Sequence, residues 1–176
     1  EEMILVLDCT RQDLPLLKDE FVQPVLQIIR QAGYDTRVEP LDSVYMTPGC
    51  NAVILTGTAL QDHEFLATGL PEWLLGWTGP VLGICAGMQL LAMSAGGDLT
   101  PDEKIGMTEI VVTKDDPVFS GRDRFNAWEL HKSGVIVPQS VHILAHGATG
   151  VQALRYADRP WYGVLFHPEV RNDWVI

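Results

Sequence analysis

The stretch from Pro80 to Ala95 reads PVLGICAGMQLLAMSA, and it changes from a strand pattern to a helix pattern at a single cysteine. Its first part, Pro80–Cys85, is a short aliphatic run typical of a strand buried on both faces. The second part, Ala86–Ala95, predicts a helix that ends at Gly96 and Gly97. A strand leading directly into a helix is the repeating unit of α/β proteins with a parallel sheet.

The residues before this stretch repeat the alternation of strand and helix. Strands are predicted at Met3–Cys9, Asp35–Leu41 and Ala52–Thr56. The apolar spacing between Leu14 and Ala32 predicts a helix, and a second helix between Asp62 and Leu75 is interrupted by Gly69 and Pro71. These elements predict an α/β fold with a mostly parallel sheet and helices on both faces.

The second half of the chain changes character. It contains strand-like segments separated mostly by turns, at Thr108–Thr113, Gly134–Val137, Val141–Ala145, Val151–Tyr156 and Tyr162–Phe166. Such a series predicts added antiparallel strands that complete or flank the parallel sheet. The sequence contains no repeat, linker or low-complexity tract, so we expect residues 1–176 to form a single domain.

Composition and charge exclude several classes of protein. The chain has 176 residues, of which 47% are hydrophobic, and its net charge is −11. An acidic surface repels nucleic acid, and no apolar stretch approaches the length of a membrane span. Glu1 and Glu2 precede the first strand without a basic region, so no signal peptide is expected. Three widely spaced cysteines and the absence of a metal-ligand pattern favour a cytoplasmic protein without a metal or cofactor.

Cys85 has the surroundings of a nucleophile. It lies between Gly83 and Gly87, and small residues on both sides permit a sharp turn from strand to helix that presents the side chain. The positive end of the following helix favours a thiolate. The N–H of Ala86 would face the oxygen that becomes negative when Cys85 attacks a carbonyl. A free cysteine is more often a buried apolar side chain, so this interpretation needs a partner base.

The sequence Phe166-His167-Pro168-Glu169 offers such a base. Residues two apart in extended backbone point to the same side, so Glu169 can orient His167 while the other imidazole nitrogen takes a proton from a thiol. Alone, the tripeptide H-P-E is better explained as an exposed polar loop. Together with the cysteine turn it predicts a triad in the order cysteine, histidine, acid, unlike the acid-before-histidine order of α/β-hydrolases.

At this point the chain resembles the class I (triad) glutamine amidotransferases over essentially its whole length. The segment G-I-C-A-G-M-Q, Gly83–Gln89, is similar to the nucleophile motif of that family, and F-H-P-E, Phe166–Glu169, matches its base motif. Ile54–Gly57 resembles the strand and loop that carry the family's oxyanion hole. The resemblance implies a flavodoxin-like α/β fold with added antiparallel strands.

The resemblance also implies roles for individual residues. Cys85 would attack the side-chain amide of glutamine, His167 would transfer the proton and Glu169 would orient His167. Backbone N–H groups of Gly57 and Ala86 would form the oxyanion hole. Residues expected to hold the substrate are Gln89, His131 and Ser133. The products would be ammonia and a γ-glutamyl thioester, which water hydrolyses to glutamate, with no cofactor and no metal.

Within that family the chain looks most similar to the separate amidotransferase subunits of GMP synthases. The similarity lies in Ile4–Asp8, Gly106–Gly121 and Glu129–Lys132, and in Tyr162-Gly163-Val164 before the base motif. It implies a partner of the ATP-pyrophosphatase type that receives the ammonia for purine biosynthesis.

The chain departs from the family pattern at several positions. Thr58 and Ala59 stand where glycine and proline are usual, Lys132 and Ser133 follow His131 in place of an x-Asp pair, and Leu165 replaces a frequent glutamine. We expect His131 to lie in a loop on the active-site side. Two other functions remain open on the sequence alone, a stand-alone γ-glutamyl hydrolase and a catalytically silent binding or regulatory protein.

Overall fold

The computed structural model describes residues 2–176, so Glu1 lies outside the described part. The strands are β1 (Met3–Asp8), β2 (Asp35–Pro40), β3 (Cys50–Leu55), β4 (Val81–Ile84), β5 (Asp98–Val112), β6 (Arg124–Ile136), β7 (Val141–His146), β8 (Val151–Tyr156) and β9 (Trp161–Val164). The helices are α1 (Gln23–Gln31), α2 (Glu64–Thr68), α3 (Glu72–Leu75) and α4 (Ala86–Ser94). Among residues 2–176, no helix is long and apolar enough to cross a membrane.

The strands form one sheet with the order β2-β1-β3-β4-β9-β8-β7-β5-β6. From β2 to β9, every neighbouring pair is parallel. The order reverses at β1, as in flavodoxin-like folds, and ligands of such sheets bind beyond the carboxyl ends of the strands near that reversal. The predicted α/β fold with added antiparallel strands is confirmed. The sheet as a whole is mixed, because the four pairs from β2 to β9 are parallel and the four pairs from β9 to β6 are antiparallel.

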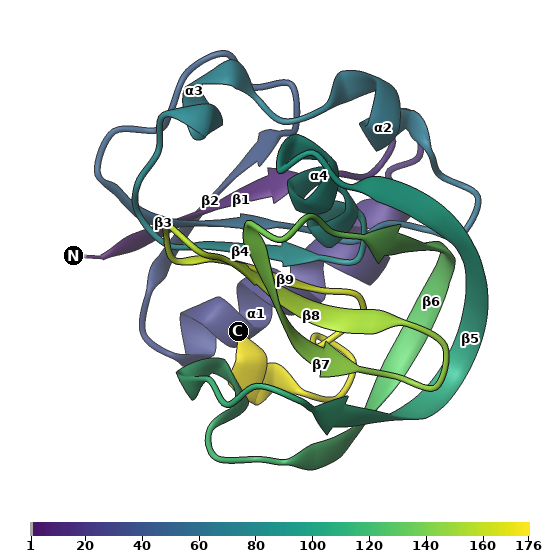
Figure 1. Ribbon diagram of the computed structural model, residues 1–176. Helices are drawn as coiled ribbons and strands as arrows, with labels where there is room; N and C mark the ends of the chain where they lie inside the picture. Colours follow the sequence, from purple (N-terminus) through teal and green to yellow (C-terminus); the bar gives the residue numbers. More distant parts are fainter. Residues whose placement is uncertain (1) are drawn as a thin grey trace.

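Helices cover both faces of the parallel half, as predicted (Figure 1). On one face, Val6, Ile54 and Ile84 pack in a cluster with the buried side chains of α1. On the other face, Leu5, Leu55 and their neighbours pack with α2, α3 and α4. This alternation buries both faces of the strands, which explains their continuous aliphatic sequences.

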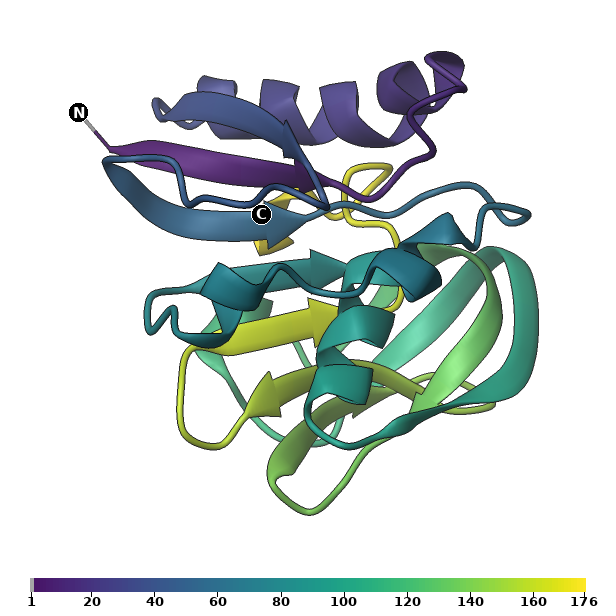
Figure 2. The same cartoon turned by 90° about the horizontal axis from the view of Figure 1, so that it is seen from above.

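The second half of the sheet is antiparallel and curls, as Figures 1 and 2 show for β5, β6, β7 and β8. Helix α4 packs into the curl through Met88 and Ala92, which lie in one cluster with Val135, Val141 and Leu154. The helix that follows Cys85 is therefore held between the two halves of the sheet, and its side chains are buried along most of its length.

Three elements, the α1 segment, β5 and β6, differ from the expected boundaries. The helical segment that ends at Gln31 starts at Leu16 and contains a π-helical turn, Lys18–Val22, directly before α1. The segments predicted at Thr108–Thr113 and Gly134–Val137 are only the ends of two long strands, β5 and β6, which pair along a hairpin. The interrupted helix expected between Asp62 and Leu75 is present as α2 and α3, with Gly69 at a φ of 68° between them.

Candidate active site

Cys85 lies in the sharp turn that the sequence predicts. Its φ of 49° and ψ of −97° are unusual for a residue with a side chain, and its N–H donates to Val164 O of β9 at 2.7 Å. A Cβ on Gly83 would lie 2.6 Å from the carbonyl carbon of Gly87. A Cβ on Gly87 would lie 2.6 Å from Leu55 Cβ. Strand and helix are thus too close for any side chain at these two positions.

His167 and Glu169 form a hydrogen-bonded pair, with Nδ1 2.7 Å from Glu169 Oε1. Both side chains are almost fully buried. The extended backbone expected between them is wrong, because Val170 N donates to His167 O and closes a turn with Pro168 at its second position. Proline favours this turn, and the turn brings the carboxylate back to the imidazole.

The backbone carbonyl of Leu130 connects the cysteine to the histidine. Cys85 Sγ lies 3.5 Å from Leu130 O, and His167 Nε2 lies 3.2 Å from the same oxygen. A carbonyl oxygen only accepts hydrogen bonds, so it binds whichever of the two groups carries the proton. The arrangement places thiol, imidazole and carboxylate in the order that nucleophilic catalysis needs.

The surroundings of His167 favour its protonated form. Burial by itself lowers the pKa of His167, but the charge and hydrogen bonding of Cys85, together with those of Glu169, outweigh it and raise the pKa well above the usual value. Both ring nitrogens then donate, one to Glu169 and one to Leu130 O. An imidazolium beside Cys85 is the partner that a reactive thiolate requires.

Gly57 and Ala86, the predicted oxyanion donors, both lie beside this array. A Cβ on Gly57 would lie 2.7 Å from His167 Cε1 and 3.5 Å from Cys85 Cβ. Among residues 2–176, no hydrogen-bond acceptor is bound to the N–H of Gly57. Ala86 is the first residue of α4, where N–H groups have no partner within the helix. Two free donors therefore lie close to Cys85.

The cavity beside Cys85 is lined by all three residues that are predicted to bind the substrate, Gln89, His131 and Ser133. Gln89 Nε2 donates to Ser133 O at 2.8 Å and so ties α4 to β6. Lys132 Nζ donates to Gln61 Oε1 at 3.1 Å. The volume of this cavity is only about 30 Å³. That is space for about one or two water molecules, so a glutamine side chain requires the walls to move apart.

The loop expected around His131 is wrong, because His131 lies within β6 and pairs with Lys104 of β5. Its Nε2 bonds Glu129 Oε1 at 2.8 Å, and Gln152 Nε2 donates to the same oxygen at 2.6 Å. Thr108 donates to the other oxygen. Burial raises the pKa of Glu129, but these hydrogen bonds outweigh it and lower the pKa. Sequence alternation fails to reveal this strand because its buried face carries a hydrogen-bonded polar pair, Glu129 and His131, instead of apolar residues.

Three residues at the site escape prediction from the sequence. Leu130 acts through its backbone carbonyl, which no residue type marks. Asp62 lines the cavity but has no motif around it. Glu129 lies two residues before His131. Side chains two apart on a strand point to the same face, so the two would have been placed together if the strand had been recognised. In residues 2–176, no group of three or more His, Cys, Asp or Glu side chains is placed to hold a metal ion.

The α/β fold, Cys85 in the turn between β4 and α4, and the hydrogen-bonded pair of His167 and Glu169 are features of a chain that matches a known family. Residues 17–173 match the model of glutamine amidotransferase class-I, and the chain belongs to that family. It is 32% identical to a subunit of the glutamine-hydrolyzing GMP synthase of Methanocaldococcus jannaschii, over 97% of this chain and 89% of that protein. It is 42% identical to the protein of the same name from Ignicoccus hospitalis, over 57% of this chain and 56% of that protein.

The comparison of structures agrees with the comparison of sequences. The fold superposes with a TM-score of 0.83 on the crystal structure of a Thermoplasma acidophilum protein that is assigned as a GMP synthase subunit. That match has 25% sequence identity and covers 99% of this chain and 92% of the other. The family resemblance noted in the sequence, including the similarity to the GMP synthase branch, is confirmed.

Proposed function

We propose that this chain hydrolyses glutamine to glutamate and ammonia, with Cys85 as nucleophile, His167 as base and acid, and Glu169 as the residue that orients His167. The observation that carries the proposal is the continuous array at the strained turn. Cys85 Sγ and His167 Nε2 share Leu130 O, and His167 Nδ1 binds Glu169. The names of the relatives, which include the words glutamine-hydrolyzing, support it.

The proposed reaction has two halves. The Cys85 thiolate attacks the side-chain amide carbon of glutamine, and the N–H groups of Gly57 and Ala86 stabilise the negative oxygen. The Nε2–H of His167 protonates the leaving nitrogen, so ammonia departs and a γ-glutamyl thioester remains on Cys85. Water, deprotonated by His167, then attacks the thioester and releases glutamate and the thiolate.

Gln89, His131 and Ser133 are proposed to hold the substrate. All three line the cavity, and His131 Nδ1 is buried without a hydrogen-bond partner among residues 2–176. A buried polar atom at a cavity wall is costly unless a ligand satisfies it. Gln89 and Ser133 join α4 to β6 across the cavity, so their hydrogen bond is expected to loosen when glutamine enters.

The destination of the ammonia is proposed to be a separate synthase of the ATP-pyrophosphatase type that makes GMP. The relatives from two organisms are named as one subunit of GMP synthase, which supports a second subunit. We propose that the chain forms a single domain, because one sheet joins its two halves. All three cysteines are free, in keeping with the reducing cytoplasm proposed for it.

The test is the release of glutamate and ammonia from glutamine by the purified chain, first without a partner and then with the ATP-pyrophosphatase subunit of a GMP synthase. Activity that rises with the partner and disappears in Cys85→Ala supports both parts of the proposal. Cys85-dependent activity without any response to the partner contradicts the proposed destination. Equal activity in the wild type and Cys85→Ala contradicts the proposed nucleophile.

A further inference from the structure

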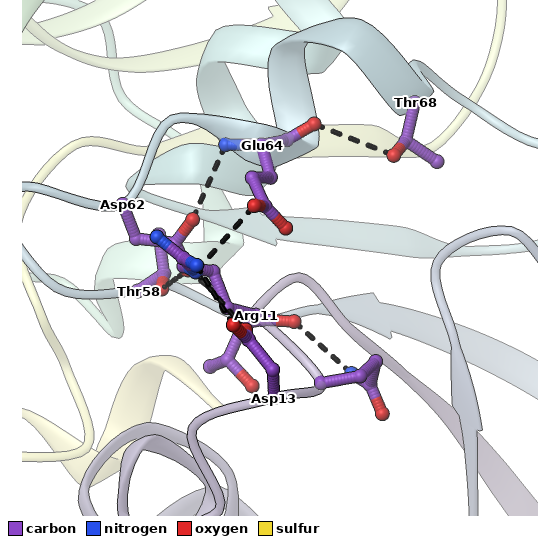
Figure 3. A network of polar contacts seen from close by, with 8 residues as sticks. Arg11, Asp13, Thr58, Asp62, Glu64 and Thr68 are labelled. Carbon is purple, nitrogen blue, oxygen red and sulfur yellow. Dashed lines mark hydrogen bonds and ion pairs between the residues drawn. The ribbon is translucent and has the colours of Figure 1, made fainter.

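The loop that carries Gly57 is held by one buried carboxylate, that of Asp62. This residue is only 3% exposed. Its Oδ2 accepts hydrogen bonds from the Thr58 hydroxyl at 2.6 Å and from Arg11 N at 2.8 Å, and its Oδ1 accepts from Glu64 N at 3.2 Å (Figure 3). Three donors from three segments converge on it, and the two oxygens of a carboxyl group have acceptor positions for all three.

This contact joins the two loops that leave β1 and β3 at their carboxyl ends. The same loops are joined a second time, because Cys9 N donates to the Thr56 hydroxyl at 3.0 Å. Asp62 N also donates to Ala59 O at 3.0 Å, which closes a turn around the segment. Gly57 therefore lies between two anchored neighbours, Thr56 and Thr58.

The Arg11 side chain lies outside this buried arrangement. Its guanidinium binds Asp13 and approaches Glu64 in a partly exposed position, as Figure 3 also shows. Exposed ion pairs of this kind contribute little. The part of Arg11 that matters for the loop is its backbone N–H, which any residue except proline supplies.

The space around Gly57 is tight, since a Cβ at this residue would lie 2.7 Å from the His167 ring. An oxyanion donor must lie within hydrogen-bond distance of the atom that becomes negative, and a displacement of about 1 Å can cost about a hundredfold in rate. Whatever fixes Thr58 thus also fixes the neighbouring N–H of Gly57. Thr58 is one of the positions where this chain departs from the usual family pattern, and its hydroxyl is the group that Asp62 binds.

We infer that Asp62 is a positioning residue for the oxyanion loop, acting through the hydroxyl of Thr58 and the backbone of Arg11. The inference rests on the proposed glutaminase activity and adds a residue to it. Asp62 does not touch the reacting atoms; it determines where the N–H of Gly57 points when Cys85 attacks. The effect is therefore expected in kcat for glutamine, with a smaller effect on KM.

The test compares Thr58→Val, which removes the hydroxyl, with Thr58→Ser, which keeps it. We expect kcat to fall about tenfold to a hundredfold in Thr58→Val and Thr58→Ser to recover most of the loss. Alkylation of Cys85 by iodoacetamide forms no oxyanion, so its rate should be the same in both variants. An equal loss of kcat in both variants, or a slower alkylation in Thr58→Val, overturns the inference.

A double-mutant cycle provides the second measurement. In an Asp62→Ala background, Thr58→Val should have almost no further effect on kcat, because the contact is already lost. Effects that multiply would mean that the two residues act independently, and would overturn the inference while leaving the glutaminase intact. Wild-type protein without Cys85-dependent glutamate release would instead contradict the proposed function itself, so the two failures are distinguishable.

Discussion

His167 has an acceptor beside each of its ring nitrogens, the carboxylate of Glu169 and the carbonyl of Leu130. A neutral imidazole carries one N–H and can satisfy only one of them, whereas an imidazolium satisfies both. In the proposed mechanism, the buried ring is thus held ready as an acid for the leaving nitrogen.

We predict that His167 titrates well above the ordinary histidine pKa of about 6.5, and that Glu169→Gln lowers its pKa. The folded pKa is raised, so the stability due to His167 is complete below the unfolded pKa and is lost as pH rises through the folded value. The excess stability of the wild type over Glu169→Gln should therefore shrink at alkaline pH. NMR of the imidazole Cε1–H measures the titration, and an ordinary pKa in the wild type would contradict a protonated His167 beside Glu169 and Cys85.

At the residue scale, the sequence could predict side chains with a motif but not groups without one. Cys85 is marked by its glycines, and His167 and Glu169 by the F-H-P-E segment. The carbonyl of Leu130 has no such mark, because every residue carries one. Asp62 belongs to an ordinary polar loop in the sequence, and only its convergence with Thr58 and Arg11 gives it a role.

At the scale of elements, the turn between β4 and α4 depends on the absence of side chains. Gly83 lies against Gly87, and Gly87 lies against Leu55, at distances that no Cβ could occupy. This close packing sets the φ and ψ of Cys85 and directs the axis of α4 into the curl of β5–β8. The strained conformation of Cys85, the proposed nucleophile, is therefore maintained by the packing of three elements.

We predict that Gly87→Ala destabilises the fold by about 1–3 kcal/mol, the usual cost of overpacking, because its Cβ would lie 2.6 Å from Leu55 Cβ and 2.7 Å from Leu55 O. The matched control is Gly76→Ala, where the nearest atom would be Trp73 O at 3.7 Å. The control should lose no stability. Urea unfolding measures both free energies, and equal values for the two variants would show that the close approach is not required.

The strands of the parallel half could be predicted almost to their ends, since aliphatic runs such as Met3–Cys9 are largely buried. The long hairpin of β5 and β6 could not. Its buried face includes Glu129 and His131, which pair with each other and interrupt the apolar alternation. A buried polar pair of this kind has no apolar signature, so the sequence placed His131 in a loop.

At the scale of the molecule, one continuous sheet carries both halves of the site. Cys85 follows a strand of the parallel half, whereas Leu130 comes from β6 at the far antiparallel edge. The curl of the sheet brings that edge back over α4 (Figure 2). The site forms only when both halves are folded, which is the physical basis of the proposed single domain.

We predict that the chain unfolds in urea as one cooperative unit. Tryptophan fluorescence should report both halves, because Trp73 packs in the parallel half and Trp128 lies in β6. Far-UV circular dichroism reports the whole backbone, and the two transitions should coincide. Two separated transitions would mean that the halves fold independently.

The decisive experiment for the proposed chemistry is to trap the acyl enzyme. Isotopically labelled glutamine is mixed with the protein, the reaction is stopped by acid within one turnover, and the peptides are analysed by mass spectrometry. We expect a labelled γ-glutamyl group on the peptide that contains Cys85, and no label on the same peptide of Cys85→Ala. Label on another residue, or rapid glutamate release with no acylated Cys85, would contradict a thioester mechanism at this cysteine.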